Sequence, residues 1–225
     1  MINSDDPVET FLKDPLRYDG TDIRHSYINN RISFEYGVDP FVILNRNLEE
    51  FNKYLKTVLD KVFSVVIFVE LFDESLIVLR RKLNWALKDV IYVIKNVRDT
   101  AIVDKYNVRD ELLPLHKNFS MFDYLLYDHF KTKLLTQIQN EGQSFWEELQ
   151  HFKDVRRNIE NFCNSSPRSI KTIRIKQNRW NDVFDISRQE CYILHVGEIP
   201  FTQMIRARQY GRATWSGPFM YREHL

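Results

Sequence analysis

The sequence has few of the residues that loop-rich folds need, and it has no long apolar segment. It contains six glycines and seven prolines among 225 residues, which argues against a loop-rich all-β fold. The longest apolar run lies within VFSVVIFVELF, residues 62–72, whereas a membrane-spanning helix needs about 20 residues. The first residues, MINSDDPVET, are acidic and polar, unlike a signal peptide. Either the protein is cytosolic or its N-terminus is incomplete.

Motifs that would identify an enzyme directly are also absent. The sequence has no GxGxxG, no Walker-type loop, no GxSxG and no HExxH. The six histidines form no cluster with cysteine, so no metal site is predicted. His129 lies among aromatic residues in DYLLYDHF, which favours a histidine in the core or on a helix surface. A net charge of +1 provides no overall attraction to nucleic acid or to a membrane.

Charge is nevertheless uneven along the chain. Residues 167–225 contain ten Lys and Arg against five Asp and Glu, so this part carries +5 and the remainder −4. The most basic stretch is PRSIKTIRIKQNRW, residues 167–180. Two interpretations stay open for it: a solvated face, or a surface that attracts an anionic ligand.

Cysteines and sequons leave further alternatives open. Cys163 and Cys191 are 28 positions apart, which is compatible with one disulfide or with two buried thiols. Asn118 and Asn164 begin glycosylation sequons, which matter only in a secretory protein. Pro167 follows the second sequon and makes Asn164 the poorer acceptor.

Hydrophobic residues at 44% and aromatics at 14% are sufficient for a real core, and the absence of linkers and repeats predicts one domain over residues 1–225. LEEFNKYLKTVLDKVF, residues 48–63, has the spacing of an amphipathic helix. VVIFVE, residues 65–70, is β-branched and uncharged until its end, which predicts a buried parallel strand. A second helix is predicted to begin near Asp73, with Leu76, Leu79 and Leu83 on one face.

The remaining segments complete the predicted fold class. DVIYVIKNV (residues 89–97) and IKTIRI (residues 170–175) are possible strands, the latter at a sheet edge. Residues 111–162 are predicted to be helical, with turns near Pro114 and Gly142. A helix, a buried strand and a helix in succession are typical of α/β layers. We therefore predict an α/β fold that is predominantly helical and contains a small, mainly parallel sheet.

The joint between the predicted strand and the second helix is rich in polar side chains. Glu70 is expected at the carboxyl end of the strand, and Asp73 and Glu74 in the first helical turn, where the helix dipole stabilises carboxylates. A helix N-terminus already occupied by acids is a poor phosphate site. Ligands of open α/β sheets bind beyond the carboxyl ends of strands. Glu70, Asp73, Glu74 and Ser75 are therefore either a structural joint or a site for a polar acceptor such as a sugar hydroxyl.

Three blocks, in order, resemble the galactose 3-O-sulfotransferases, a family of Golgi enzymes that includes galactosylceramide sulfotransferase. The first is ETFLKDP followed by INNRISFEYGVD, and the second is ELFDESLIVLRRKLNW followed by DVIYVIKN. The third is MFDYLLYDHFKTKLLTQIQNEGQSFWEEL. The resemblance is strongest over residues 9–163 and weak over the basic C-terminal segment 164–225.

The resemblance implies a P-loop-like sulfotransferase domain on the luminal side of the Golgi membrane. It implies transfer of a sulfuryl group from 3'-phosphoadenosine 5'-phosphosulfate to the 3-hydroxyl of a galactose on a glycolipid or glycan, without a metal. Glu70, Asp73, Glu74 and Ser75 then belong to the acceptor side.

The sequence departs from the family in one respect. The glycine- and lysine-containing donor loop, the later Arg/Ser donor segment, the catalytic base and the membrane anchor are expected upstream of ETFLKDP, where few residues remain. The expectation is therefore a truncated catalytic domain, inactive by itself, with no catalytic or donor-binding residue identified. The alternative is a non-catalytic paralogue that binds a galactoside or a protein.

Overall fold

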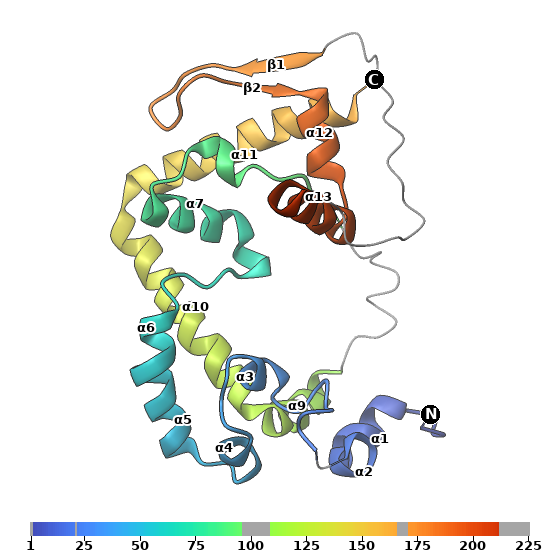
Figure 1. Cartoon of the computed structure of the whole chain (residues 1–225). Coiled ribbons are helices and arrows are strands. Elements are labelled where there is room, and N and C mark those ends of the chain that lie inside the picture. Colours follow the sequence, from blue (N-terminus) through green and yellow to red (C-terminus); the bar gives the residue numbers. More distant parts are fainter. Residues whose placement is uncertain (1, 21, 96–108, 166–170, 212–225) are drawn as a thin grey trace. The chain divides into compact units, whose positions relative to one another are not determined.

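The computed structural model describes residues 2–20, 22–95, 109–165 and 171–211, most of which are helical (Figure 1). The chain divides into two compact units, which are described one at a time. The first comprises Met1–Leu83 and Asn96–Glu147, and the second Asn84–Lys95 and Glu148–Leu225. None of the helices in the described ranges has both the length and the hydrophobicity needed to cross a membrane.

The first unit is built from helices and short helical turns. In chain order these are α1 (Pro7–Lys13), α2 (Pro15–Asp19), α3 (Arg31–Glu35), α4 (Pro40–Leu44), α5 (Leu48–Tyr54), a π-helical turn (Leu55–Leu59), α6 (Asp60–Val62), a 3₁₀ turn (Val69–Leu71), α7 (Phe72–Leu83), a 3₁₀ turn (Asp110–Leu112), α9 (Leu113–Phe119), α10 (Met121–Glu141) and the start of α11 (Gln143–Asn164).

The predicted helix over residues 48–63 is present, but its buried face differs from the prediction. Phe51 and Leu55 are buried as expected, whereas Val58 and Val62 are 36% and 64% exposed and Leu59 is buried instead. The buried positions thus follow a four-residue spacing through the π-helical turn at Leu55–Leu59.

Helix α10 provides the central stripe of this unit. Every fourth residue along it is buried, and these are Phe122, Leu126, Phe130, Leu134 and Ile138. The Phe51 ring of α5 lies 4.6 Å from the Phe122 ring, centroid to centroid. Gly142 ends α10 with a φ of 70°, a conformation that glycine adopts at little cost. The predicted turn at Gly142 is therefore correct, whereas Pro114 lies in the first turn of α9.

The prediction of a buried parallel strand at Val65–Glu70 is wrong. Residues 64–68 form no strand, and Val69–Leu71 forms a 3₁₀ turn. Ile67 is 41% exposed and Val69 is 89% exposed. Phe68 has extended backbone angles, but a strand also needs a neighbour that pairs with it, and within the described ranges no segment pairs with residues 64–68.

The second unit contains the sheet of the described structure. Its elements are the greater part of α11, a 3₁₀ turn (Leu87–Val90), β1 (Thr172–Ile175), β2 (Phe184–Ser187), α12 (Arg188–His195) and α13 (Glu198–Tyr210). Strands β1 and β2 pair antiparallel, with Ile173 opposite Ile186. The expected mainly parallel sheet is thus replaced by an antiparallel hairpin. The strand predicted in IKTIRI is correct, whereas residues 91–95 form no strand and residues 96–97 lie outside the described ranges.

Local signals explain where α12 begins. The Ser187 hydroxyl accepts a hydrogen bond from the Glu190 amide at 3.2 Å, and the Glu190 carboxylate accepts one from the Ser187 amide at 2.8 Å. This reciprocal pair is a capping box, which satisfies two backbone donors that the first helical turn leaves unpaired.

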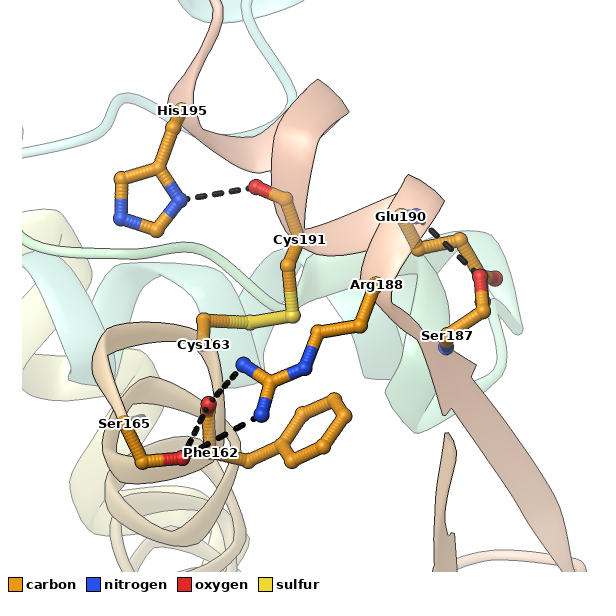
Figure 2. Close-up of a disulfide and its surroundings, with 8 residues drawn as sticks. All are labelled: Phe162, Cys163, Ser165, Ser187, Arg188, Glu190, Cys191 and His195. Carbon is orange, nitrogen blue, oxygen red and sulfur yellow. Dashed lines mark hydrogen bonds between the residues drawn. A yellow bond between two sulfur atoms is a disulfide. The ribbon is translucent and has the colours of Figure 1, made fainter. Parts of the chain in front are cut away.

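A disulfide joins the end of α11 to α12 (Figure 2). Cys163 and Cys191 have Cα atoms 5.2 Å apart, so the structure has the first of the two alternatives that the sequence leaves open. Beside it, the Arg188 guanidinium donates to the Phe162 carbonyl at 2.6 Å and lies 4.1 Å from the centre of the Phe162 ring (Figure 2). The disulfide and Arg188 therefore secure the same helix end.

Removing the disulfide is expected to destabilise the second unit. A cross-link between residues 28 positions apart lowers the entropy of the unfolded chain, and its loss costs about 3–4 kcal/mol of unfolding free energy. The measurement is chemical denaturation of the Cys163→Ala/Cys191→Ala double variant, with the wild-type protein under reducing conditions as the matched control. The free energy of unfolding should fall by a similar amount in both samples. A decrease below about 1 kcal/mol would contradict the prediction.

Candidate functional site

The predicted site residues lie at the joint where the extended segment 64–68 passes through the 3₁₀ turn Val69–Leu71 into α7. Asp73 and Glu74 are half-buried in the first turn of α7. Carboxylates at this position are favoured by the partial positive charge of the helix N-terminus. The joint therefore begins a helix as predicted, although a 3₁₀ turn rather than a strand leads into it.

Ser75 holds this joint together from inside. Its side chain is fully buried, and its hydroxyl accepts a hydrogen bond from the Phe68 amide at 3.2 Å. Because a buried amide without an acceptor is costly, this bond determines how the extended segment enters the turn. Ser75 thus supports the backbone beneath Glu70 and does not face solvent.

Glu70 belongs to a polar cluster with two residues of α10, Tyr127 and Lys131, which we call the Glu70 cluster. The Tyr127 hydroxyl donates to the Glu70 carboxylate. The Lys131 ammonium lies 3.1 Å from the same carboxylate and 2.8 Å from the Tyr127 hydroxyl. The Phe68 ring meets the Tyr127 ring edge-on at 5.3 Å. Aromatic surface therefore lies next to an acceptor and a cation.

The electrostatics of the Glu70 cluster favour a binding role. The hydrogen bond from Tyr127, then a backbone hydrogen bond at Glu70, and then the contacts with Lys131 hold the pKa of Glu70 below its ordinary value of 4.5. The hydrogen bonds that Lys131 makes with Tyr127 and with Glu70 raise the pKa of Lys131. Both groups are therefore charged at neutral pH. A carboxylate with a lowered pKa is a weak general base, but it is a strong acceptor of hydrogen bonds from hydroxyl groups.

A second cluster lies on the other flank of the same helix. The Asp60 carboxylate of α6 lies 2.9 Å from His129 Nε2 and 2.7 Å from Lys133 Nζ. Partial burial raises the pKa of Asp60, but the contacts with His129 and Lys133 together outweigh it, so the pKa lies below its ordinary value. A shallow surface hollow is lined by Asp60, Asp128, His129, Thr132 and Lys133. His129 is thus a partly exposed histidine on the helix surface, which is one of the two predicted environments.

The residues that make up both clusters were not predicted from the sequence. Tyr127 and Lys131 are four residues apart, as are His129 and Lys133, and this spacing places each pair on one side of a helix. The carboxylates they meet lie 57 to 73 positions earlier in the chain. The spacing on α10 was visible in the sequence, but the carboxylate partners were not.

The basic stretch of the second unit is already partly neutralised. Arg174 of β1 forms a bidentate ion pair with Asp185 of β2, with N–O distances of 2.8 and 2.9 Å. The Arg179 guanidinium lies 5.4 Å from the centre of the Trp180 ring. Arg168 falls outside the described residues. The ion pair satisfies Arg174, and the choice between a solvated face and an anion-binding surface stays open for the remaining basic residues of the stretch.

The two candidate glycosylation sites have different surroundings. Asn118 is exposed, but its side-chain oxygen accepts a hydrogen bond from Arg46 at 2.9 Å. In the same sequon, Ser120 is buried and donates to the Ile28 carbonyl at 2.9 Å. Asn164 is exposed at the end of α11, and the third residue of its sequon lies outside the described residues.

Comparison with known proteins identifies the family. The model of the family galactose-3-O-sulfotransferase matches residues 1–188. The chain belongs to this family. The match confirms the resemblance predicted from the three sequence blocks, and it includes both the joint at Glu70 and helix α10.

The curated relatives of this family are considerably longer than the matched region. Mouse galactose-3-O-sulfotransferase 2 is 28% identical over 164 residues, which are 71% of this chain and 40% of the relative. Human galactose-3-O-sulfotransferase 2 is 29% identical over 69% of this chain and 39% of the relative. Human galactosylceramide sulfotransferase is 30% identical over 63% of this chain and 33% of the relative. The chain thus spans about two fifths of the length of the first of these. No solved structure matches.

Metal binding has no support in the described ranges, where His, Cys, Asp and Glu form no group of three or more that could hold an ion.

Replacing Ser75 is expected to destabilise the joint. In Ser75→Ala the buried Phe68 amide loses its acceptor, which should lower the unfolding free energy by about 1–3 kcal/mol. The matched control is Ser64→Ala, which alters an exposed side chain in the same segment and should change stability by less than about 0.5 kcal/mol. Equal effects in chemical denaturation would show that the Ser75 bond does not hold the joint.

The pKa of Glu70 should rise toward 4.5 in Tyr127→Phe, because the largest cause of its lowering is the Tyr127 hydrogen bond. A carboxylate with a lowered pKa contributes stability above the unfolded-state pKa and loses that contribution as the pH falls through its folded-state pKa. When the pH is lowered below 4.5, the free energy of unfolding of the variant should therefore fall less than that of the wild type. Carboxyl-carbon NMR titration measures the shift. Tyr124→Phe, which removes a hydroxyl bonded to His116, should leave Glu70 unchanged, and an unshifted Glu70 in Tyr127→Phe would refute the assignment.

Proposed function

We propose that this chain forms the acceptor side of a galactose-3-O-sulfotransferase. Enzymes of this kind move a sulfuryl group from 3'-phosphoadenosine 5'-phosphosulfate to the 3-hydroxyl of a galactose on a glycolipid or glycan. The observation that carries the proposal is the family match over residues 1–188. All three residues of the Glu70 cluster lie within this range. Glu70, Asp73 and Glu74 are the residues assigned to the acceptor, and Ser75 fixes the joint behind them.

The chemistry of the Glu70 cluster suits a sugar. The ionised Glu70 accepts hydrogen bonds from sugar hydroxyls, and Lys131 donates to sugar oxygens. The Phe68 and Tyr127 rings supply an apolar surface with a polar tip for the less polar face of a pyranose. In the proposed reaction Glu70 orients the acceptor. A separate base removes the proton of the acceptor hydroxyl, because the lowered pKa of Glu70 makes it unsuited to that step.

Two sites in the described ranges do not fit the sulfuryl donor. The donor carries several negative charges, and the N-terminus of α7 is occupied by Asp73 and Glu74, which disfavour an anion there. Arg174 is paired with Asp185. We therefore derive no step of the reaction that passes through the donor, and we assign its binding to the parts of a family member outside the matched region.

The proposed location is the lumen of the Golgi, where enzymes of this family act. The disulfide between Cys163 and Cys191 supports it, because disulfides persist in oxidising compartments and are rare in the cytosol.

Calorimetry with methyl β-galactoside tests the acceptor role. We expect weak binding to the wild-type chain. Glu70→Gln should weaken it by at least roughly tenfold, because a hydrogen bond to a charged group contributes about 1.5–3 kcal/mol and 1.4 kcal/mol is a factor of about ten in affinity. The control is Glu49→Gln, which changes an exposed carboxylate on α5 and should have no effect.

The donor is tested in parallel with 3'-phosphoadenosine 5'-phosphate, for which we expect no heat of binding. Binding of the donor product with micromolar affinity would overturn the donor assignment. No heat with the galactoside, or equal losses in Glu70→Gln and Glu49→Gln, would reject the acceptor role.

A further inference from the structure

The Glu70 cluster is open to solvent, and its two charged groups largely cancel each other. The Glu70 side chain is 45% exposed and the Lys131 side chain 34% exposed, so a ligand can reach both. Both groups are charged at neutral pH, because the pKa of Glu70 is lowered and that of Lys131 is raised. Their charged atoms lie 3.1 Å apart. An anion that contacts Lys131 therefore also lies next to the Glu70 carboxylate, which opposes its attraction to the ammonium.

Further carboxylates follow Glu70 at the joint. Asp73 and Glu74 lie in the first turn of α7, and α7 packs against α10 (Figure 1). The N-terminus of a helix contributes roughly half a positive charge, which is less than the charge of the two carboxylates in its first turn. These residues thus set three carboxylates against the one ammonium of Lys131, which makes the joint unfavourable for a ligand with a negative charge.

Such a joint distinguishes sugars by their charge. A sugar hydroxyl is neutral and donates a hydrogen bond to an ionised carboxylate, which is a strong acceptor. A sulfate ester has oxygens that accept hydrogen bonds and carries a negative charge, so it offers no donor to a carboxylate. Like charges placed next to each other in a binding site strongly disfavour binding. The acceptor and the sulfated product of the proposed reaction therefore differ in how the Glu70 carboxylate interacts with them.

We propose that Glu70 makes the site selective for an uncharged galactose and causes it to reject a galactose that already carries a sulfate. The Glu70 carboxylate binds the hydroxyl groups of the acceptor and repels the sulfate group once it is attached. This repulsion favours release of the product and keeps sulfated galactosides from occupying the site. The inference rests on the proposed acceptor role of Glu70, and it adds to that role the kind of ligand that the site excludes.

The test is NMR titration of the chain with two ligands, methyl β-galactoside and methyl β-galactoside 3-sulfate. The amide resonances of residues 68–75 report binding at the joint. We expect the wild-type chain to bind the 3-sulfate at least about tenfold more weakly than the uncharged galactoside, because like charges a few ångströms apart repel each other. High salt should reduce this difference, since screening weakens the interaction between exposed charges.

The variant Glu70→Gln separates charge from shape. Glutamine has nearly the same size as glutamate, but it removes the negative charge and with it the ion pair of Lys131. The variant should bind methyl β-galactoside more weakly than the wild type, and it should bind the 3-sulfate at least about tenfold more tightly. The matched control is Glu49→Gln, which changes an exposed carboxylate on α5 and should leave both affinities unchanged.

The possible failures can be told apart. Equal affinities of the wild-type chain for the two ligands would overturn the selectivity and leave the acceptor role of Glu70 intact. Rejection of the 3-sulfate that persists unchanged in Glu70→Gln would also overturn it, because the rejection would then be steric. If methyl β-galactoside does not bind at all, the acceptor role fails and the selectivity fails with it.

Discussion

The buried stripe of α10 is the constraint on which the rest of the first unit depends. With Phe122, Leu126, Phe130, Leu134 and Ile138 directed inward at four-residue intervals, the two flanks of the helix are fixed as well. One flank presents Tyr127 and Lys131 to Glu70, and the other presents His129 and Lys133 to Asp60. Burial of the apolar face already sets the orientation of α10 before either carboxylate meets it. The hydrogen bonds and ion pairs of the two clusters therefore do not have to supply the free energy that orients the helix.

The second unit reaches order by different means. Its hairpin has two strands, which are marginal by themselves, and it is supplemented by the long helix α11 and by covalent and ionic links. The disulfide and Arg188 act at the same end of α11, and Arg174 pairs with Asp185 across the hairpin. Two of its basic residues, Arg174 and Arg188, therefore contribute to the fold of this unit.

Prediction from the sequence succeeded for elements whose ends depend on nearby residues. It failed for the strand, whose formation depends on a distant segment that pairs with it. The start of α7 at Phe72 and the turn at Gly142 follow from acidic residues in a first helical turn and from glycine at positive φ. The start of α12 was not predicted, although SRQE is a capping-box pattern that is present in the sequence. The parallel strand at 65–70 failed for the opposite reason: β-branched composition makes a segment able to pair, but it does not supply the second strand.

By itself the sequence determined the family, the helices over residues 48–63, from near Asp73 and over most of residues 111–162, and the polar character of the joint at Glu70–Ser75. Ordered motifs and residue spacing can be read along the chain without knowledge of distant contacts. The helices α1–α4, α12 and α13 were not predicted. The tertiary structure alone decided that Ser75 turns inward to hold the Phe68 amide, that Glu70 meets Tyr127 and Lys131, and that Cys163 and Cys191 are joined. These contacts connect residues that lie 7 to 61 positions apart. The physical reason is that packing, and not local propensity, chooses which distant groups become neighbours.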